Sequence, residues 1–198
     1  MTYTAVDYEI DYPESLSRWL WLVKGVLALP HWIVLAFFGY FIMLATWLAG
    51  WVLLFTGRYP ESIFKMVASY ARWQGRVNAY VYFLRDEYPP FSGDEDAAYP
   101  VRITLKQPMK GDLSRWLWLV KGLLVFPNLI AYLFYAIAAI FAYFIAGWII
   151  LFTGNMPRGF FNFIAGMHYW SFRQQAYSSW LITDDYPPFS GAPSKEID

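Results

Sequence analysis

Apolar and polar residues alternate along the chain in long blocks, and the two longest apolar blocks decide the predicted fold class. Residues 19–55 contain one charged side chain, Lys24, and residues 116–152 also contain one, Lys121. As a straight helix either block would be ~55 Å long, whereas the hydrocarbon core of a bilayer is ~30 Å thick. Two full crossings would need ~40 residues and a turn. Each block therefore fits neither one nor two ideal membrane spans.

A proline lies about a third of the way along each block, at Pro30 and Pro127. Proline inside a helix removes a hydrogen bond and breaks or kinks the helix. Two paths for the first block follow. In one, an interfacial or re-entrant helix over residues 16–29 precedes a membrane helix from about residue 31 to 56. In the other, the block is a tight intramembrane hairpin that turns near residues 37–41.

A third segment, residues 61–85 and again 158–182, has the pattern of an amphipathic helix. Lys65, Arg72 and Arg76 fall on one narrow stripe of a helical wheel, opposite an apolar side. This pattern predicts a helix that lies in the headgroup region of a membrane. A true crossing is the alternative, but it would put Arg76 near mid-bilayer at a cost of at least ~2.5 kcal/mol. In the later segment only Arg173 remains on the stripe.

Two short stretches alternate strictly between apolar and polar residues. The first, residues 6–12, carries acids at its polar positions, and the second, residues 101–106, carries bases. They can pair as two strands of a small sheet in water. A solvated arm is an equal alternative, because a lone two-stranded ribbon is only marginally stable.

The chain contains an internal repeat at an offset of 97 residues. Residues 18–25 recur letter for letter as residues 115–122, and 22 of the 42 positions in residues 16–57 match their partners. Tyr-Pro-Pro-Phe-Ser-Gly closes both copies, at residues 88–93 and 186–191. We therefore predict a tandem duplication. Unit 1 covers residues 1–93 and contains membrane block 16–56 and amphipathic helix 61–85. Unit 2 covers residues 98–191 and contains membrane block 113–153 and amphipathic helix 158–182. Residues 94–97 form a linker between the units, and residues 192–198 form a tail.

Composition supports a membrane protein. Hydrophobic residues make up 58% of the chain and charged residues 15%, compared with about 25% charged in a typical soluble domain. The formal net charge is zero, which disfavours nucleic acid as a partner. We thus predict an all-α integral membrane protein, built from a repeated apolar hairpin or long broken helix plus an interfacial helix, with extended or β arms in water.

Charge placement suggests how the two copies are oriented. Residues 1–14 hold four acids and no base, so no secretory signal is expected there. The same Ser-Arg-Trp-Leu-Trp and Thr-Gly motifs flank both apolar blocks. This suggests that equivalent ends of the two blocks meet the same environment. This favours an even number of crossings, or a re-entrant path, with both copies parallel. The positive-inside rule then makes the termini and the linker cytoplasmic.

Basic and tryptophan residues beside the apolar blocks are the main candidate site. Their expected counter-charges are anionic lipid phosphates, although they can also snorkel to water, and the tryptophans can also pack inside the bundle. The interface candidates are Arg18, Lys24, Arg72, Arg76, Arg115, Lys121, Arg173, Trp19, Trp21, Trp116 and Trp118. Small residues at a four-residue spacing predict a helix–helix contact. These packing candidates are Ala45, Ala49, Ala138, Ala142 and Ala146.

The sequence has no recognisable catalytic or metal-binding pattern. The two histidines, His31 and His168, have no ligand spacing, and the chain has no cysteine. No phosphate-binding loop or nucleophile elbow occurs, and adjacent acids lie only in polar segments. We predict no enzyme activity, no metal and no cofactor.

Taken together, the Arg-initiated Trp-rich helix, the block ending in Leu-Phe-Thr-Gly, the amphipathic aromatic helix and the Tyr-Pro-Pro-Phe close resemble the bacterial membrane family called domain of unknown function 4389. Both copies carry these motifs. The resemblance implies an integral membrane protein of bacterial type, and it brings no established activity and no catalytic residues. We therefore predict a location in the bacterial inner membrane.

The functional hypothesis that follows is a non-enzymatic scaffold. It would bind lipid, shape the bilayer or serve as an accessory subunit, with anionic lipids, other membrane-complex subunits or a second copy of itself as partners. The alternative is a small transporter or channel for anions between the two units, lined by Arg76 and Arg173.

Overall fold

The computed structural model describes residue 3 and residues 5–192, and this part of the chain is mostly helical. The tail predicted over residues 192–198 lies outside the described residues, apart from residue 192. The elements in chain order are β1 (Val6–Ile10), η1 (Leu20–Leu22), α1 (Lys24–Leu27), α2 (Leu29–Thr56), α3 (Glu61–Val81), β2 (Val101–Leu105), α4 (Trp118–Leu124), α5 (Phe126–Thr153) and α6 (Arg158–Ser178).

Each apolar block contains one long helix preceded by short helical turns. Pro30 and Pro127 lie in the first turn of α2 and α5, where the missing N–H has no helical acceptor to lose. Gly57 and Gly154 end the two helices in the left-handed conformation, with φ of 67° and 74°. The long helix predicted after each proline is therefore confirmed, whereas the helix predicted over residues 16–29 is present only as the short turns η1 and α1. The hairpin turning near residues 37–41 is wrong, because α2 continues without interruption through them.

The amphipathic segments form α3 and α6, which follow the long helices after short loops. Each begins after a proline and has 21 residues, ending a few residues before the predicted limit. Phe83 and Leu181 lie just past their ends with positive φ, 63° and 58°, so the chain turns away there instead of continuing the helix. Small residues allow close packing against α3. An added Cβ at Gly75 would lie only 2.1 Å from Ile103 Cδ1 of β2.

The two arms pair as an antiparallel sheet, so the strand alternative is confirmed over the solvated one. Val6 faces Leu105, and Glu9 faces Arg102. The apolar positions of both strands are buried. The Tyr8 hydroxyl donates to Gly75 O of α3 at 3.0 Å, and its ring contacts Tyr169 of α6. A ribbon that would be marginal alone is thus stabilised by packing on both helices.

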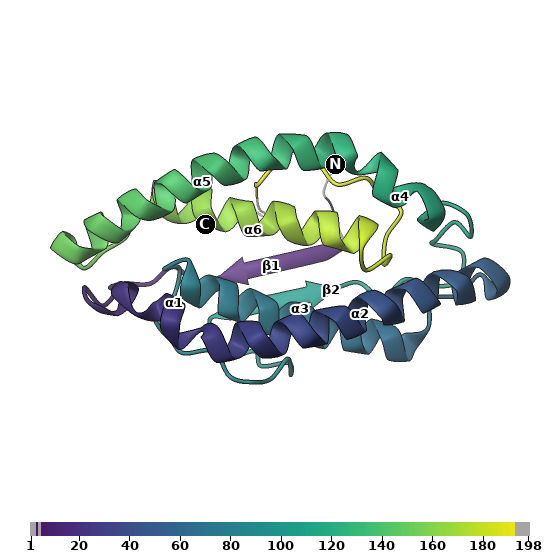
Figure 1. Ribbon diagram of the computed structural model, residues 1–198, viewed down its shortest axis with the longest axis horizontal. Helices are drawn as coiled ribbons and strands as arrows, with labels where there is room; N and C mark the ends of the chain where they lie inside the picture. The colour runs from purple at the N-terminus through teal and green to yellow at the C-terminus, as the bar shows by residue number, and fades with distance from the viewer. Residues whose placement is uncertain (1–2, 4, 193–198) are drawn as a thin grey trace.

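Figure 1 shows how the elements are arranged. In this view the α2/α3 pair lies below the two-stranded sheet and the α5/α6 pair lies above it, and α3 and α6 both pack on its apolar face, which carries Tyr8 and Ile103. The colour gradient shows that α2 and α5 run in opposite directions. Within the protein the two copies are therefore antiparallel to each other, and not parallel as predicted. The first half of the chain therefore meets the second half with an approximate two-fold relation, and one strand from each half joins them.

Reciprocal contacts lock the halves together. The Trp118 ring packs on Gly50 of α2, where an added Cβ would lie 2.6 Å from Trp118 Cε3. Trp21 lies in the same way on Gly147 of α5, with the nearest approach to an added Cβ at 3.2 Å. The Leu16 N–H donates to Gly154 O at 2.8 Å. The segment before each long helix thus packs on the far end of the other long helix.

Candidate membrane-contact site

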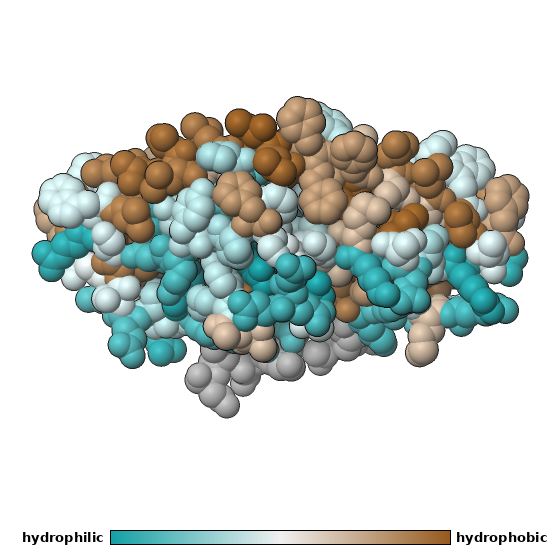
Figure 2. Space-filling model, turned by 90° about the horizontal axis from the view of Figure 1, so that it is seen from below, coloured by the Kyte–Doolittle hydropathy of each residue, from teal (hydrophilic) through white to brown (hydrophobic). Residues whose placement is uncertain are grey.

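The exposed apolar side chains are confined to two parts of the chain. Apart from five loop residues, every exposed large apolar side chain in the described structure lies within residues 19–55 or 116–152. The exceptions are Tyr88, Phe91, Met109, Tyr186 and Phe189. We call the exposed apolar side chains of residues 19–55 and 116–152 the apolar band. Figure 2 shows brown side chains along one side of the molecule from end to end, with teal side chains on the other side of that view.

The α2 and α5 helices are long and apolar enough to cross a membrane by length and composition. Only 28% of the most apolar window of α2 and 17% of that of α5 are buried within the protein. A core helix of a soluble protein would be mostly covered. Exposed apolar patches on soluble monomers rarely exceed a few hundred Å², and larger ones are typical of surfaces that contact a membrane or a partner.

The α3 and α6 helices have the opposite character. Within the described residues, neither helix exposes any large apolar side chain. Their apolar residues pack inward, as Val67 and Ala71 of α3 and Ile164 and Ala176 of α6 do. The apolar residues of α3 and α6 therefore pack inside the protein, and these helices add nothing to the apolar band.

The tryptophan candidates divide into two kinds. Trp19 and Trp116 are 71% and 68% exposed, beside the exposed Arg18 and Arg115. They lie where an interfacial tryptophan and a basic residue are expected, at the start of each block. Trp21 and Trp118 instead pack across the halves on Gly147 and Gly50, which agrees with the packing alternative for these two.

Lys24 and Lys121 are buried, with 1% of each residue exposed. The Lys24 ammonium lies 2.6 Å from Asp86 Oδ1 and donates to Arg85 O at 2.6 Å. Lys121 repeats both contacts, with Asp184 at 2.7 Å and Thr183 O at 2.6 Å. Burial lowers the pKa of both lysines, and the hydrogen bond to the carboxylate opposes this shift.

This placement corrects the lipid-headgroup role predicted for these two lysines. Their charges are turned inward and already neutralised by a carboxylate distant in sequence. Each ammonium also lies over a tyrosine ring, Lys24 at 4.9 Å from Tyr80 and Lys121 at 5.0 Å from Tyr177. The pairs hold the segment after α3 or α6 against the start of each block. They are structural contacts.

The arginines of α3 and α6 bind the loops that close each half. Arg76 donates to Ser92 O at 3.2 Å and to Asp94 O at 2.7 Å. Arg173 donates to Ser190 O and Ala192 O at the same distances. Both residues are nearly fully buried, so a lipid-headgroup role is corrected for them as well. Arg72 pairs with Glu95 and is only partly exposed.

The small-residue candidates are found in three environments. Ala49 and Ala146 are fully buried, beside the glycines that receive Trp118 and Trp21. Ala45 and Ala142 are half-buried, and Ala138 is exposed. The buried end of the stripe therefore lies in the contact between the halves.

The Tyr-Pro-Pro-Phe loops fold back on their own half. The Tyr88 hydroxyl donates to Leu27 O at 3.1 Å, and Phe91 stacks on His31 at 3.8 Å between ring centroids. In the other half, Tyr186 donates to Leu124 O and Asn128 donates to Pro187 O. The loops cover the first turns of α2 and α5.

The sequence analysis did not predict that His31 and Asn128 occupy equivalent positions and accept equivalent hydrogen bonds. Trp73 Nε1 donates to His31 Nδ1 at 3.0 Å, and Trp170 Nε1 donates to Asn128 Oδ1 at 2.7 Å. The acceptors are 97 residues apart, as are the two donors. The signal was available in the alignment of the two halves. It shows that His31 is a buried hydrogen-bond acceptor.

The second histidine has a packing role. His168 is buried against the Tyr82 ring, with centroids 4.6 Å apart. Burial lowers the pKa of His168 to about 3, so it is neutral at ordinary pH. Among the described residues no three His, Asp or Glu side chains gather where they could hold a metal ion.

Comparison with known proteins supports the family resemblance for the first half of the chain. The profile of the family described as Domain of unknown function (DUF4389) matches residues 18–93. The match runs from the start of the first apolar block through α3 to the close at Gly93, which is the first predicted copy without its N-terminal arm, and the second predicted copy is not matched. Neither a curated protein nor a solved structure matches the chain.

Proposed function

We propose that this protein is a non-enzymatic membrane scaffold that embeds its apolar band in a single leaflet. In this arrangement α2 and α5 lie in the plane of the membrane, and the sheet and closing loops face water. The observation that carries the proposal is the confinement of exposed apolar side chains to residues 19–55 and 116–152. A helix with one apolar face exposed is the usual form of an interfacial anchor.

The elements packed beside α2 favour this orientation over a crossing. α3 lies along α2 and is joined to it by a short loop, and both are long enough to span much of a bilayer at ~1.5 Å per residue. If α2 stood upright, Arg72 and its partner Glu95 would be carried to the depth of the hydrocarbon. A charge at that depth costs at least ~2.5 kcal/mol on insertion scales. Lying flat avoids this cost.

We further propose that the two halves arose by tandem duplication and that the scaffold serves a bacterial inner membrane from its cytoplasmic side. Two embedded helices in one leaflet add area to that leaflet alone, which favours curvature. Anionic lipid would be drawn to Arg18 and Arg115, which remain exposed beside the band. A larger complex would use the same body as an accessory subunit.

Flotation with vesicles tests the membrane contact. Phe37 and Phe134 are equivalent exposed residues of the band. The F37D/F134D variant should lose co-flotation with vesicles of phosphatidylcholine and phosphatidylglycerol, because two carboxylates would have to enter the apolar region. The matched control adds the same charges outside the band, at the exposed Ser62 and Asn162 as S62D/N162D. Equal loss in both variants would contradict the proposal.

Labelling of single cysteines tests the orientation, since the native chain has none. Cysteines at exposed positions 58, 95 and 155 should all react with an impermeant maleimide from the same side of sealed vesicles. If positions 58 and 155 report one side and position 95 the other, the flat orientation is wrong and each half crosses.

The anion-transport alternative has less support. Arg76 and Arg173 would have to line the path, yet both guanidinium groups are buried and donate to loop carbonyls. Chloride or phosphate flux through reconstituted protein, lost in R76A/R173A but not in R72A, would restore this alternative.

A further inference from the structure

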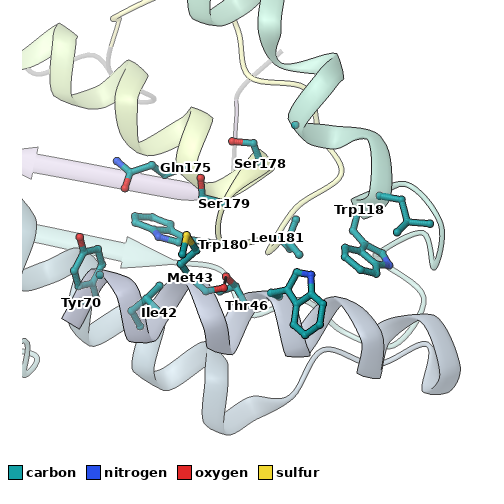
Figure 3. A pocket seen from close by; sticks show the side chains of 14 residues that line it. Ile42, Met43, Thr46, Tyr70, Trp118, Gln175, Ser178, Ser179, Trp180 and Leu181 are labelled. Atoms are coloured by element: carbon teal, nitrogen blue, oxygen red, sulfur yellow. Dashed lines mark hydrogen bonds between the residues drawn. The ribbon is translucent and has the colours of Figure 1, made fainter. Parts of the chain in front are cut away.

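A cleft of about 520 Å³ opens between the first half of the molecule and the end of α6 (Figure 3). This volume lies within the range of small-molecule sites, ~300–1,000 Å³. The α2 and α3 helices form one wall, while α4 and the residues that follow α6 form the other. The residues that matter for its shape are Ile42, Thr46, Tyr70, Trp118, Trp180 and Leu181.

The cleft is continuous with the apolar band. Three of its lining residues, Met43, Trp47 and Leu119, belong to the band and are 63%, 52% and 52% exposed. A molecule dissolved in the surrounding lipid could therefore enter between α2 and α4 without passing through water.

The lining has hydrogen-bonding groups and no charge. None of the residues that line the cleft is Lys, Arg, Asp or Glu. Its polar groups include the Thr46, Tyr70 and Ser179 hydroxyls and the Gln175 amide. In Figure 3 the Tyr70 ring stands up from the α2/α3 wall with its hydroxyl toward α6. A charged ligand would lie here without a counter-charge, at high cost, whereas an uncharged polar head would find partners.

The equivalent place in the other half is filled. Thr46 corresponds to Tyr143 at the offset of 97, and Leu181 corresponds to Phe83 after the one-residue insertion. The positive φ of both Phe83 and Leu181 marks them as the same backbone position. Tyr143 stacks on Phe83 with centroids 4.3 Å apart and lies 5.4 Å from Tyr82. Two stacked rings thus lie at the place that corresponds to Thr46 and Leu181 in the cleft.

We propose that this cleft binds a neutral lipid, meaning a hydrocarbon chain with an uncharged hydroxyl or ester head group. The head lies among the hydroxyls of Thr46, Tyr70 and Ser179, and the chain leaves past Met43 and Trp47 into the bilayer. The inference rests on the proposed membrane contact, because the ligand arrives through the apolar band. The space exists because Thr46 and Leu181 are smaller than their counterparts, Tyr143 and Phe83.

Photolabelling tests the site directly. The probe is monooleoylglycerol with a diazirine in its acyl chain, added to protein in phosphatidylcholine vesicles and, separately, in micelles of an uncharged detergent. Adducts should map to residues 39–47, 118–122 and 175–181, and excess monooleoylglycerol should remove them. Oleate and octadecane should compete at least about tenfold less well, because one places an unpaired charge in the cleft and the other has no head group. Equal competition by oleate would overturn the proposed chemistry.

Variants copied from the filled half supply the decisive comparison. T46Y/L181F should lower cleft labelling about tenfold, because the added rings occupy the space. Labelling of band residues 129–137 should stay constant, and Y143F should behave as wild type. If the double variant labels like wild type, the cleft is not the site.

The converse variant guards against a folding defect. Y143T/F83L should open a second cleft and gain adducts on residues 136–144. Position 167, which corresponds to Tyr70, is Met, so Y143T/F83L/M167Y also restores that hydroxyl, and a folded triple variant without new labelling overturns the proposal. The micelle arm separates this failure from failure of the scaffold function, because cleft labelling in micelles does not need vesicle binding.

Discussion

The Lys24 ammonium lies 2.6 Å from the Asp86 carboxylate, although the two residues are far apart in the chain. The other oxygen of the same carboxylate accepts the Ser17 N–H at 2.5 Å. Asp184 holds Lys121 and the Ser114 N–H in the same way, at 2.7 Å and 2.5 Å. One carboxylate in each half therefore ties the segment after α3 or α6 to the chain on both sides of an exposed tryptophan.

Replacing either carboxylate should destabilise the fold strongly. D86N or D184N leaves a buried ammonium without its counter-charge, which typically costs ~3–5 kcal/mol. The measurement is the free energy of unfolding in detergent, from denaturant titration followed by tryptophan fluorescence.

The matched control for this prediction is E87Q. Glu87 pairs with Arg85 but is about half exposed, so its loss should cost less than ~1 kcal/mol. Similar losses for D86N and E87Q would contradict the structural role of the buried pair.

The lowered pKa of Lys24 and Lys121 predicts how stability depends on pH. Burial places the folded pKa below the ordinary value of 10.5, so the unfolded state binds more protons between the two values. The free energy of unfolding should therefore rise with pH in that window. Wild type and K24M should be compared from pH 8 to 11. A lysine contribution that falls with rising pH would contradict the burial argument.

Gly50 and Gly147 should respond differently to alanine. Alanine favours a helix by up to ~1 kcal/mol over glycine. At Gly50 the new Cβ would meet the Trp118 ring at 2.6 Å, so overpacking of ~1–3 kcal/mol outweighs that gain. At Gly147 the nearest ring atom is 3.2 Å away, and G147A should be close to neutral. Thermal unfolding of the two variants side by side checks this order, and a neutral G50A would contradict it.

His31 should tolerate asparagine and reject alanine. H31N copies the acceptor that Asn128 offers to Trp170, whereas H31A leaves the buried Trp73 N–H without a partner at ~1–3 kcal/mol. The free energy of unfolding of H31N should lie closer to wild type than that of H31A. N128A is the matched test in the other half, and equal stability of H31N and H31A would exclude the hydrogen-bond role.

The ends of the long helices could be predicted from the sequence because local rules determine them, although the sequence left a hairpin open as the alternative path between those ends. Pro30 fixes the first turn of α2, and Gly57 supplies the left-handed end. The alternation of residues 6–12 likewise anticipated β1, and the opposite charges of the two arms anticipated the pairing of Glu9 with Arg102.

The roles of the basic residues could not be predicted, because their partners are distant in sequence. Asp86 reaches Lys24 only after α2 and α3 have packed, and Arg76 reaches Ser92 O and Asp94 O only once the closing loop folds back. A helical wheel shows that such residues share a polar stripe of the helix. It does not show whether their side chains bind a loop carbonyl or a lipid phosphate. The cleft was equally hidden, since it depends on which side chains face one another across the halves.

The reciprocal seating of Trp21 on Gly147 and of Trp118 on Gly50 makes each half the completing piece of the other. Fragments 1–97 and 98–198, produced as separate polypeptides, should therefore associate with each other. In either fragment alone, the glycine lacks its tryptophan neighbour and the indole ring is left exposed. A homologue with a single copy would make both contacts only as a dimer, in which the tryptophan of each copy packs on the glycine of the other.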